Sequence, residues 1–115
     1  MIARLQTKAL LKLFENAMIY KLNPLLESVP IKFTSKGVVV NDRQLNSIAV
    51  YGRYSPAYFI DYQVDEEYAV TLTRTMYKAV KQYLRKEDFI TVKIEDDNIV
   101  FEGVRSSYSE PLQEP

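Results

Sequence analysis

The sequence predicts an α+β domain in which two helices cover one face of an antiparallel β-sheet. Three observations lead to this prediction. Stretches that alternate apolar and polar residues, as half-buried strands do, occupy most of the chain. Two segments instead repeat apolar residues at helical spacing, and polar turns separate neighbouring strands. Because a sheet and an amphipathic helix each have an apolar face to bury, both helices are expected to pack on the same side of the sheet.

The chain is expected to open with a strand and a helix. Residues 1–6 alternate like a strand, and Thr7 is placed to cap a helix over residues 8–21. The apolar side chains of that helix share one face, formed by Leu10, Leu11, Phe14, Ala17 and Met18. Asn23–Pro24 ends the helix, because proline has neither the amide hydrogen nor the steric room to continue it.

Several strands are expected between the two helices. They cover residues 30–36, 38–40, 47–54, 58–64 and 68–72. The first two form a hairpin around Ser35-Lys36-Gly37, where glycine suits a turn residue with positive φ. Residues 41–46 are predicted to be a polar loop, and Ser55–Pro56 turns the chain before the strand over 58–64.

The second helix is expected over residues 71–86, with Thr71 or Thr73 as its N-cap and with Arg85 and Lys86 at the negative end of its dipole. Its apolar face is formed by Met76, Tyr77, Val80, Tyr83 and Leu84. Its cations occupy a different stripe, roughly 60° wide at ~100° per residue, which contains Arg74, Lys78, Lys81 and Arg85. The segment contains no acidic residue that would neutralise this stripe.

The first helix also turns cations away from its apolar face. Lys8 and Lys12 lie on the opposite side, together with Glu15. A row of cations is most often a solvated surface that keeps a helix soluble. Two helices of similar polarity, one of them free of carboxylates, favour a binding role for these cations.

A final hairpin and a tail complete the chain. Residues 89–95 and 99–104 are expected to pair around the tight turn Asp96-Asp97-Asn98. We expect residues 1–104 to form a single domain. The polar tail over 105–115 contains two prolines, and it is either a weak edge strand or disordered.

Composition excludes several classes of function. The 15 basic and 15 acidic residues cancel, so any attraction to nucleic acid must come from how the charges are distributed. Cysteine and histidine are both absent, which excludes disulfides, thiol catalysis and imidazole or thiolate metal sites, and removes the usual general base. The acidic groups Asp65–Glu67 and Glu95–Asp97 lack the spacing of a calcium loop. We therefore expect a protein that is not an enzyme and that needs no cofactor or metal ion.

Membranes and single-stranded nucleic acid are less favoured as partners. No apolar run approaches membrane-spanning length and no signal-peptide pattern opens the chain, so we expect a soluble, intracellular, cytoplasmic protein with no membrane partner. A group of residues interleaves aromatic rings with a cation, and its members are Tyr51, Arg53, Tyr54, Tyr58 and Tyr62. Such rings can stack on single-stranded nucleic acid, but tyrosine is also a favoured strand residue with a packed ring, and we favour the second interpretation.

The order and spacing of these segments resemble one domain of the sliding DNA clamps of the proliferating cell nuclear antigen type, in particular their amino-terminal domain. The resemblance runs over residues 1–104. It is carried by the stretches MIARLQTKALLKLFENAM, FTSKGVVVNDRQ and AVTLTRTMYKAVKQYLRKEDFITVKIEDDNIVFEG. These look like the opening strand and first inner helix of the family, its second hairpin, and the strand, second inner helix and hairpin that follow.

The resemblance implies a specific function. In such clamps, domains join edge to edge into a closed ring, and basic residues of the inner helices meet DNA phosphates without reading sequence. Carried over by position, the DNA-facing residues would be Arg74, Lys78, Lys81, Arg85, Lys8 and Lys12. The expected partners are duplex DNA, further copies of this chain and replication proteins, as for a processivity factor. The alternative is a clamp-mimicking interaction module that binds a replication or repair partner through a sheet edge without encircling DNA.

This chain departs from the family pattern in three respects. It holds one domain where clamp subunits hold two or three, so a closed ring would need about six copies. The connector that helps form the partner-peptide pocket of the family is absent or reduced to Glu110–Pro115. The strand used for pairing between subunits would have to lie near residues 104–112, where Pro111 removes one amide donor.

Overall fold

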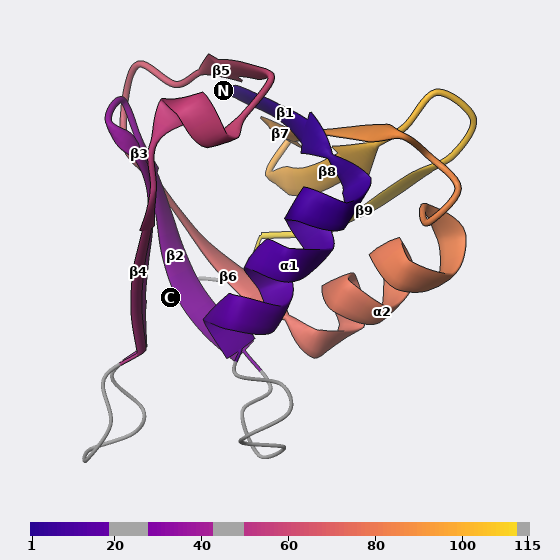
Figure 1. The fold of residues 1–115 in the computed structure, drawn as a ribbon, viewed down its shortest axis with the longest axis horizontal. Helices are drawn as coiled ribbons and strands as arrows, with labels where there is room; N and C mark the ends of the chain where they lie inside the picture. The colour runs from indigo at the N-terminus through magenta and orange to yellow at the C-terminus, as the bar shows by residue number, and fades with distance from the viewer. Residues whose placement is uncertain (19–27, 43–49, 113–115) are drawn as a thin grey trace.

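In the part of the chain that the structure describes, two α-helices pack against two antiparallel β-sheets (Figure 1). A computed structural model describes residues 1–18, 28–42 and 50–112. The five-stranded sheet contains, in spatial order, β5 (Asp61–Gln63), β1 (Ile2–Gln6), β7 (Phe89–Glu95), β8 (Asn98–Glu102) and β9 (Ser107–Pro111). The four-stranded sheet contains β4 (Val50–Tyr54), β3 (Gly37–Asp42), β2 (Ser28–Thr34) and β6 (Tyr68–Thr73). The helices are α1 (Thr7–Met18), α2 (Arg74–Tyr83) and the short 3₁₀ helix η1 (Pro56–Tyr58).

The α+β fold with two helices on antiparallel strands is confirmed, and the strands divide between two sheets. Each helix directly follows a strand, but the two strands belong to different sheets: β1 leads into α1 and β6 leads into α2. One helix therefore follows a strand of each sheet, and the two helices lie next to each other in one layer. The alternation of apolar and polar residues does not predict this division. It indicates which side chains of a strand are buried, but not which other strands that strand pairs with.

One hydrophobic core joins both sheets and both helices. Phe14 of α1 and Phe101 of β8 are its largest fully buried side chains, and their ring centroids lie 5.9 Å apart. Alternate residues of the strands point into this core, as Ala3 and Leu5 of β1 do, while Arg4 between them is exposed. Burying a phenylalanine of this kind contributes roughly 1.5–3 kcal/mol to folding.

The start of α1 is tied to a distant part of the chain. The Thr7 hydroxyl, expected to cap this helix, instead donates a hydrogen bond to the backbone carbonyl of Glu87. The Thr7 amide donates to the carbonyl of Asp88 at 3.1 Å. The predicted apolar face is largely confirmed, with Leu10, Phe14 and Ala17 buried. The predicted extension over residues 19–21, the Met18 side chain and the break at Asn23–Pro24 lie outside the described residues.

The second helix is shorter than predicted. Thr73 is the N-cap, because its hydroxyl accepts a hydrogen bond from the Met76 amide at 3.2 Å. At the other end, Leu84 leaves the helical conformation with ψ 4°, and the Glu87 amide closes a turn onto its carbonyl at 3.0 Å. Helix α2 therefore ends at Tyr83, and the predicted placement of Arg85 and Lys86 in its last turn is wrong.

Hairpin turns follow local chemistry. Gly37 has φ +123° in the turn between β2 and β3, and a Cβ there would lie 2.2 Å from the Tyr54 carbonyl oxygen. Asp96 and Asp97 both adopt positive φ, 52° and 62°, which suits a two-residue hairpin between β7 and β8. Both predicted turns are confirmed.

The middle of the chain departs from the strand prediction. Residues 56–58 form η1, because Pro56 fixes a φ value suited to a helical turn, and only Asp61–Gln63 of the predicted strand over 58–64 pairs, as β5. Residues 41–42, predicted as loop, extend β3, and residues 50–54 of the next predicted strand form β4. Residues 43–49 lie outside the described residues.

The tail contains a strand. Residues 107–111 pair with β8 from Ser107 opposite Glu102 to Pro111 opposite Asn98, which makes β9 an edge of the five-stranded sheet. Of the two alternatives for the tail, the edge strand is the one found. Pro111 closes the strand, where its missing amide donor costs little.

Candidate nucleic-acid interface

Helices α1 and α2 lie next to each other on the outside of the core (Figure 1). The Phe14 ring of α1 lies 5.9 Å from the Tyr77 ring of α2, centroid to centroid. The Tyr77 hydroxyl also donates a hydrogen bond to Glu15 Oε2 at 3.0 Å. The two helices therefore form one continuous surface.

Four lysines lie on this surface. Lys8 and Lys12 of α1 and Lys78 and Lys81 of α2 are all exposed. The apolar sides of the same helices are buried, which leaves the opposite sides for solvent or a ligand. Arg74, the first residue of α2, is half-buried. Burial thus agrees with the helical faces that the sequence predicted for these residues.

A chain of contacts runs from a cation of α2 to a carboxylate of α1. The Lys81 ammonium lies 5.5 Å from the centroid of the Tyr77 ring, and the Tyr77 hydroxyl reaches Glu15. A cation over an aromatic face gains about 0.5–1 kcal/mol at an exposed site. Glu15 is the only carboxylate in the two helices, and it is held by this contact. The surface is therefore cationic with a single negative charge.

Arg85, the remaining candidate for DNA contact, lies outside the row of cations on α2. Arg85 is exposed, but it lies beyond the end of α2, in the turn that leads to β7. Its direction is therefore not set by the spacing of ~100° per residue that grouped it with Arg74, Lys78 and Lys81. Tyr83, predicted to pack, is 59% exposed in the last turn of the helix.

Sequence reasoning missed the pairing of Glu15 with Tyr77. Both side chains were assigned to a helix face, but nothing connected the two helices. The available signal was the hydroxyl of Tyr77, since a tyrosine on an apolar face usually finds a polar partner when it is buried.

The tyrosines near β4 and β5 serve packing. The Tyr58 hydroxyl donates to the Ala9 carbonyl at 2.8 Å, and the Tyr62 hydroxyl donates to the Thr34 carbonyl at 2.6 Å. Burial raises the pKa of both tyrosines. Tyr54 packs edge-on against Tyr58 with ring centroids 4.9 Å apart. These rings are engaged within the fold, as favoured from the sequence, while the side chains of Tyr51 and Arg53 lie outside the described residues.

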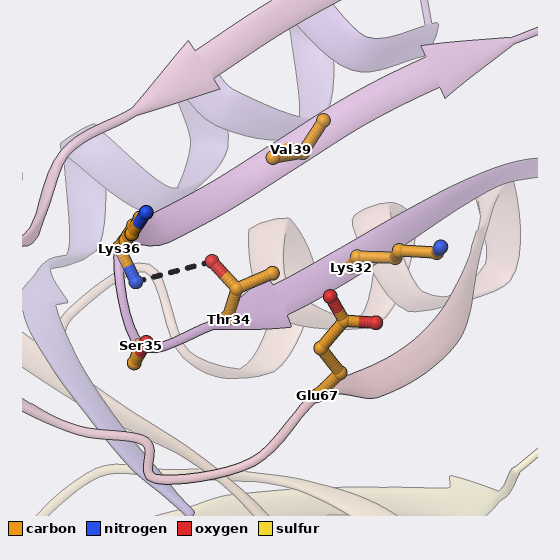
Figure 2. A pocket seen from close by; sticks show the side chains of 6 residues that line it. All are labelled: Lys32, Thr34, Ser35, Lys36, Val39 and Glu67. Carbon is orange, nitrogen blue, oxygen red and sulfur yellow. Dashed lines mark hydrogen bonds between the residues drawn. The ribbon is translucent and has the colours of Figure 1, made fainter.

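A shallow depression lies on the face of the four-stranded sheet that is turned away from the core. This depression of about 380 Å³ is lined by Lys32, Thr34, Ser35, Lys36, Val39 and Glu67 (Figure 2). Lys32 and Lys36 point away from one another in it. The Thr34 hydroxyl is already engaged, since it accepts from the Lys36 amide at 3.1 Å and donates to the Gly37 carbonyl at 2.8 Å. With a carboxylate in its lining and no convergent cations, this depression is a poorer candidate than the helical surface.

The described residues offer neither a metal site nor a membrane span. Across residues 1–18, 28–42 and 50–112, no three acidic side chains gather in a way that would hold a metal ion. None of the helices in these ranges is long and apolar enough to cross a membrane.

The fold, with its two adjacent helices, is that of a PCNA-type clamp domain. The chain is similar to a crystal structure of the PCNA2–PCNA3 complex from Sulfolobus tokodaii, with a TM-score of 0.79 and 16% identity over 100% of this chain and 47% of that chain. It is also similar to A. fulgidus PCNA bound to the C-terminal region of FEN-1, with a TM-score of 0.78 and 18% identity over 99% of this chain and 45% of that chain. The clamp resemblance seen in the sequence is thereby confirmed as a fold.

The similarity is one of structure and covers part of each clamp chain. This chain spans about half the length of these two clamp chains, at 47% and 45%. No protein-family model and no curated protein matches the sequence.

Proposed function

We propose that this protein is a non-enzymatic, clamp-like DNA-associated protein that holds duplex DNA by its phosphates on α1 and α2. The observation that carries the proposal is the set of exposed lysines on two adjacent helices whose apolar faces are buried: Lys8, Lys12, Lys78 and Lys81. Ammonium groups on flexible stems contact phosphates as point charges and do not read base sequence. Arg74 at the start of α2 adds to this cationic region, and Arg85, in the turn beyond the end of the helix, is a further candidate for phosphate contact.

Self-association is the second part of the proposal. A single helix pair covers little of a DNA duplex, so a clamp needs further copies around it. Strand β9 borders the five-stranded sheet and β4 borders the four-stranded sheet, and pairing of such edges adds backbone hydrogen bonds between copies. The similar S. tokodaii structure is a complex of two PCNA chains, which supports an assembly built from several chains.

The test is a comparison of two double variants with equal charge. Lys78→Gln with Lys81→Gln removes two cations from α2, and Lys32→Gln with Lys36→Gln removes two from the opposite face of the four-stranded sheet. DNA affinity is measured by fluorescence anisotropy across a salt series, with several unrelated duplexes.

We expect the α2 variant to bind every duplex more weakly and its salt slope to fall by roughly 0.9 for each phosphate that the variant no longer binds. The control variant should keep the slope of the unmodified protein. Equal weakening in both variants, or weakening confined to one duplex sequence, would contradict binding by the helices.

The alternative is an interaction module in the cytoplasm that keeps the clamp fold and binds a replication or repair protein without encircling DNA. The observation in its favour is β9, whose outer edge pairs with no other described strand and is free to accept a strand from a partner. The similar A. fulgidus PCNA is bound to a region of FEN-1. Capture of such a partner, together with no DNA affinity at low salt, would favour this alternative.

A further inference from the structure

The turn between β8 and β9 closes around a carboxylate from another part of the chain. Glu87, which precedes β7, is 9% exposed. Its Oε1 accepts a hydrogen bond from the Val104 amide at 2.8 Å, and its Oε2 accepts from the amides of Arg105 at 2.9 Å and Ser106 at 3.1 Å. One side chain thus satisfies three consecutive backbone donors.

The turn is shaped to receive this side chain. A Cβ at Gly103 would lie 2.4 Å from both Cγ and Cδ of Glu87, so glycine is needed for the close approach. The Gly103 amide donates to the Ser106 carbonyl at 2.8 Å, which closes the turn itself.

Glu87 is also fixed through its backbone. Its amide donates to the Leu84 carbonyl at 3.0 Å, just after α2, and its carbonyl accepts from the Thr7 hydroxyl at the start of α1. The carboxylate therefore places the turn relative to both helices.

Hydrophobic packing does not explain the position of the turn. Val104 at its tip is 91% exposed, and Arg105 beside it is exposed as well. The three amides instead hold the carboxylate in its charged form, and with Arg105 they keep the pKa of Glu87 below its ordinary value against the opposing effect of burial. The hydrogen bonds of a charged acceptor are thus the contacts that order this turn.

The turn sets where β9 begins. Ser107, the first residue of the strand, directly follows the last amide that Glu87 holds. Farther along, β9 has contacts of its own: Tyr108 and Thr73 donate to Glu110 at 2.5 and 3.4 Å, and the Leu112 amide donates to the Asp97 carbonyl at 2.9 Å. Glu87 supplies the matching anchor at the beginning of the strand.

We infer that Glu87 is a positioning residue for self-association, because its carboxylate holds the turn over 103–106 so that edge strand β9 is presented to a second copy of this chain. The inference rests on the proposed self-association through sheet edges. An edge strand that is ordered before contact loses less conformational freedom when it pairs, and association is stronger for that reason.

The experiment compares Glu87→Gln with Asp88→Asn, which makes the same charge change at the neighbouring exposed residue. The glutamine side chain would turn an amide group toward backbone donors that need an acceptor. Residue-specific hydrogen exchange reports the turn, and light scattering over a dilution series reports association. In Glu87→Gln we expect the amides of residues 104–106 to exchange at least about tenfold faster and association to weaken by a similar factor, as loss of charged hydrogen bonds implies. Asp88→Asn should match the unmodified protein in both.

Three results would overturn the inference in distinguishable ways. Faster exchange with unchanged association would leave Glu87 a structural residue only. Unchanged exchange would show that the carboxylate does not hold the turn. An unmodified chain that stays monomeric at every concentration would refute the proposed self-association, and the inference with it. If Glu87→Gln does not fold, the same two measurements are made on Glu87→Asp. This variant keeps the negative charge, but its side chain is one methylene group shorter, so the carboxylate is farther from the three amides.

Discussion

Glu110 shows how one side chain joins an edge strand to a helix. Its Oε2 accepts the Tyr108 hydroxyl at 2.5 Å, and its Oε1 accepts the Thr73 hydroxyl at 3.4 Å. Thr73 is at the same time the N-cap of α2. A carboxylate that accepts a hydrogen bond from a tyrosine stabilises the protonated form of that tyrosine.

The titration of Tyr108 tests this contact. The hydrogen bond to Glu110, and then burial, raise the pKa of Tyr108 to about 12 from an ordinary value of 10.0. Because the folded-state pKa is the higher one, the stabilisation is fully present below pH 10 and is lost as the pH rises through about 12. Glu110→Gln should lower the pKa of Tyr108 toward its ordinary value, as read from the ring resonances of this tyrosine by NMR. Tyr62, whose pKa is raised by burial, is the internal control and should titrate as before.

At the scale of elements, the limits of α2 decide which of its residues form the surface. The helix begins where the Thr73 hydroxyl accepts the Met76 amide, and it ends at Tyr83. Because the helix ends there, Arg85 lies outside the cationic stripe, and Tyr83 in the last turn is exposed. The effect on Arg85 follows from the backbone of Leu84, since a residue outside the helix no longer shares its angular spacing.

Thr73→Ala should destabilise the protein by about 1 kcal/mol through loss of the cap. Thr75→Ala, two residues along the same segment, changes an exposed threonine and should stay within about 0.5 kcal/mol. Urea unfolding followed by circular dichroism measures both. Equal destabilisation by the two changes would show that the cap contributes nothing specific.

At the scale of the whole molecule, attraction to DNA phosphates depends on how charge is distributed over the surface and not on the net charge. The formal net charge is zero, yet the two helices carry Glu15 as their single carboxylate against four exposed lysines. Acidic residues gather elsewhere, as in the exposed turns at Asp65–Glu67 and Glu95–Asp97. Under the proposed function, this uneven distribution would attract a phosphate backbone to the face formed by the two helices.

Glu15→Gln should therefore tighten DNA binding by about two- to fivefold at low salt, because one repulsive charge leaves the cationic surface. The gain should shrink as salt is added, since screening weakens interactions between exposed charges. Glu67→Gln, on the far side of the four-stranded sheet, is the matched control and should leave affinity unchanged. Anisotropy titrations at two salt concentrations measure both variants, and an equal gain in each would assign the effect to net charge alone.

Much of the fold was predictable from local patterns. The buried faces of α1 and α2, the β2–β3 and β7–β8 hairpins and the cap at Thr73 all depend on residues within one turn or one strand of each other. The exposed positions of Lys8, Lys12, Lys78 and Lys81 follow from the same periodicity. The role of these lysines with DNA remains a prediction.

The sequence by itself determined the α+β class, the helix faces and the turns, because hydrophobic period and turn chemistry act over a few residues. The tertiary structure decided the division into two sheets, the early end of α2, the edge position of β9 and the contacts between distant side chains. Glu15 meets Tyr77 across 62 positions, and Glu87 meets Val104 across 17. No local sequence pattern predicts such contacts, because they form only when separate elements have packed around one core.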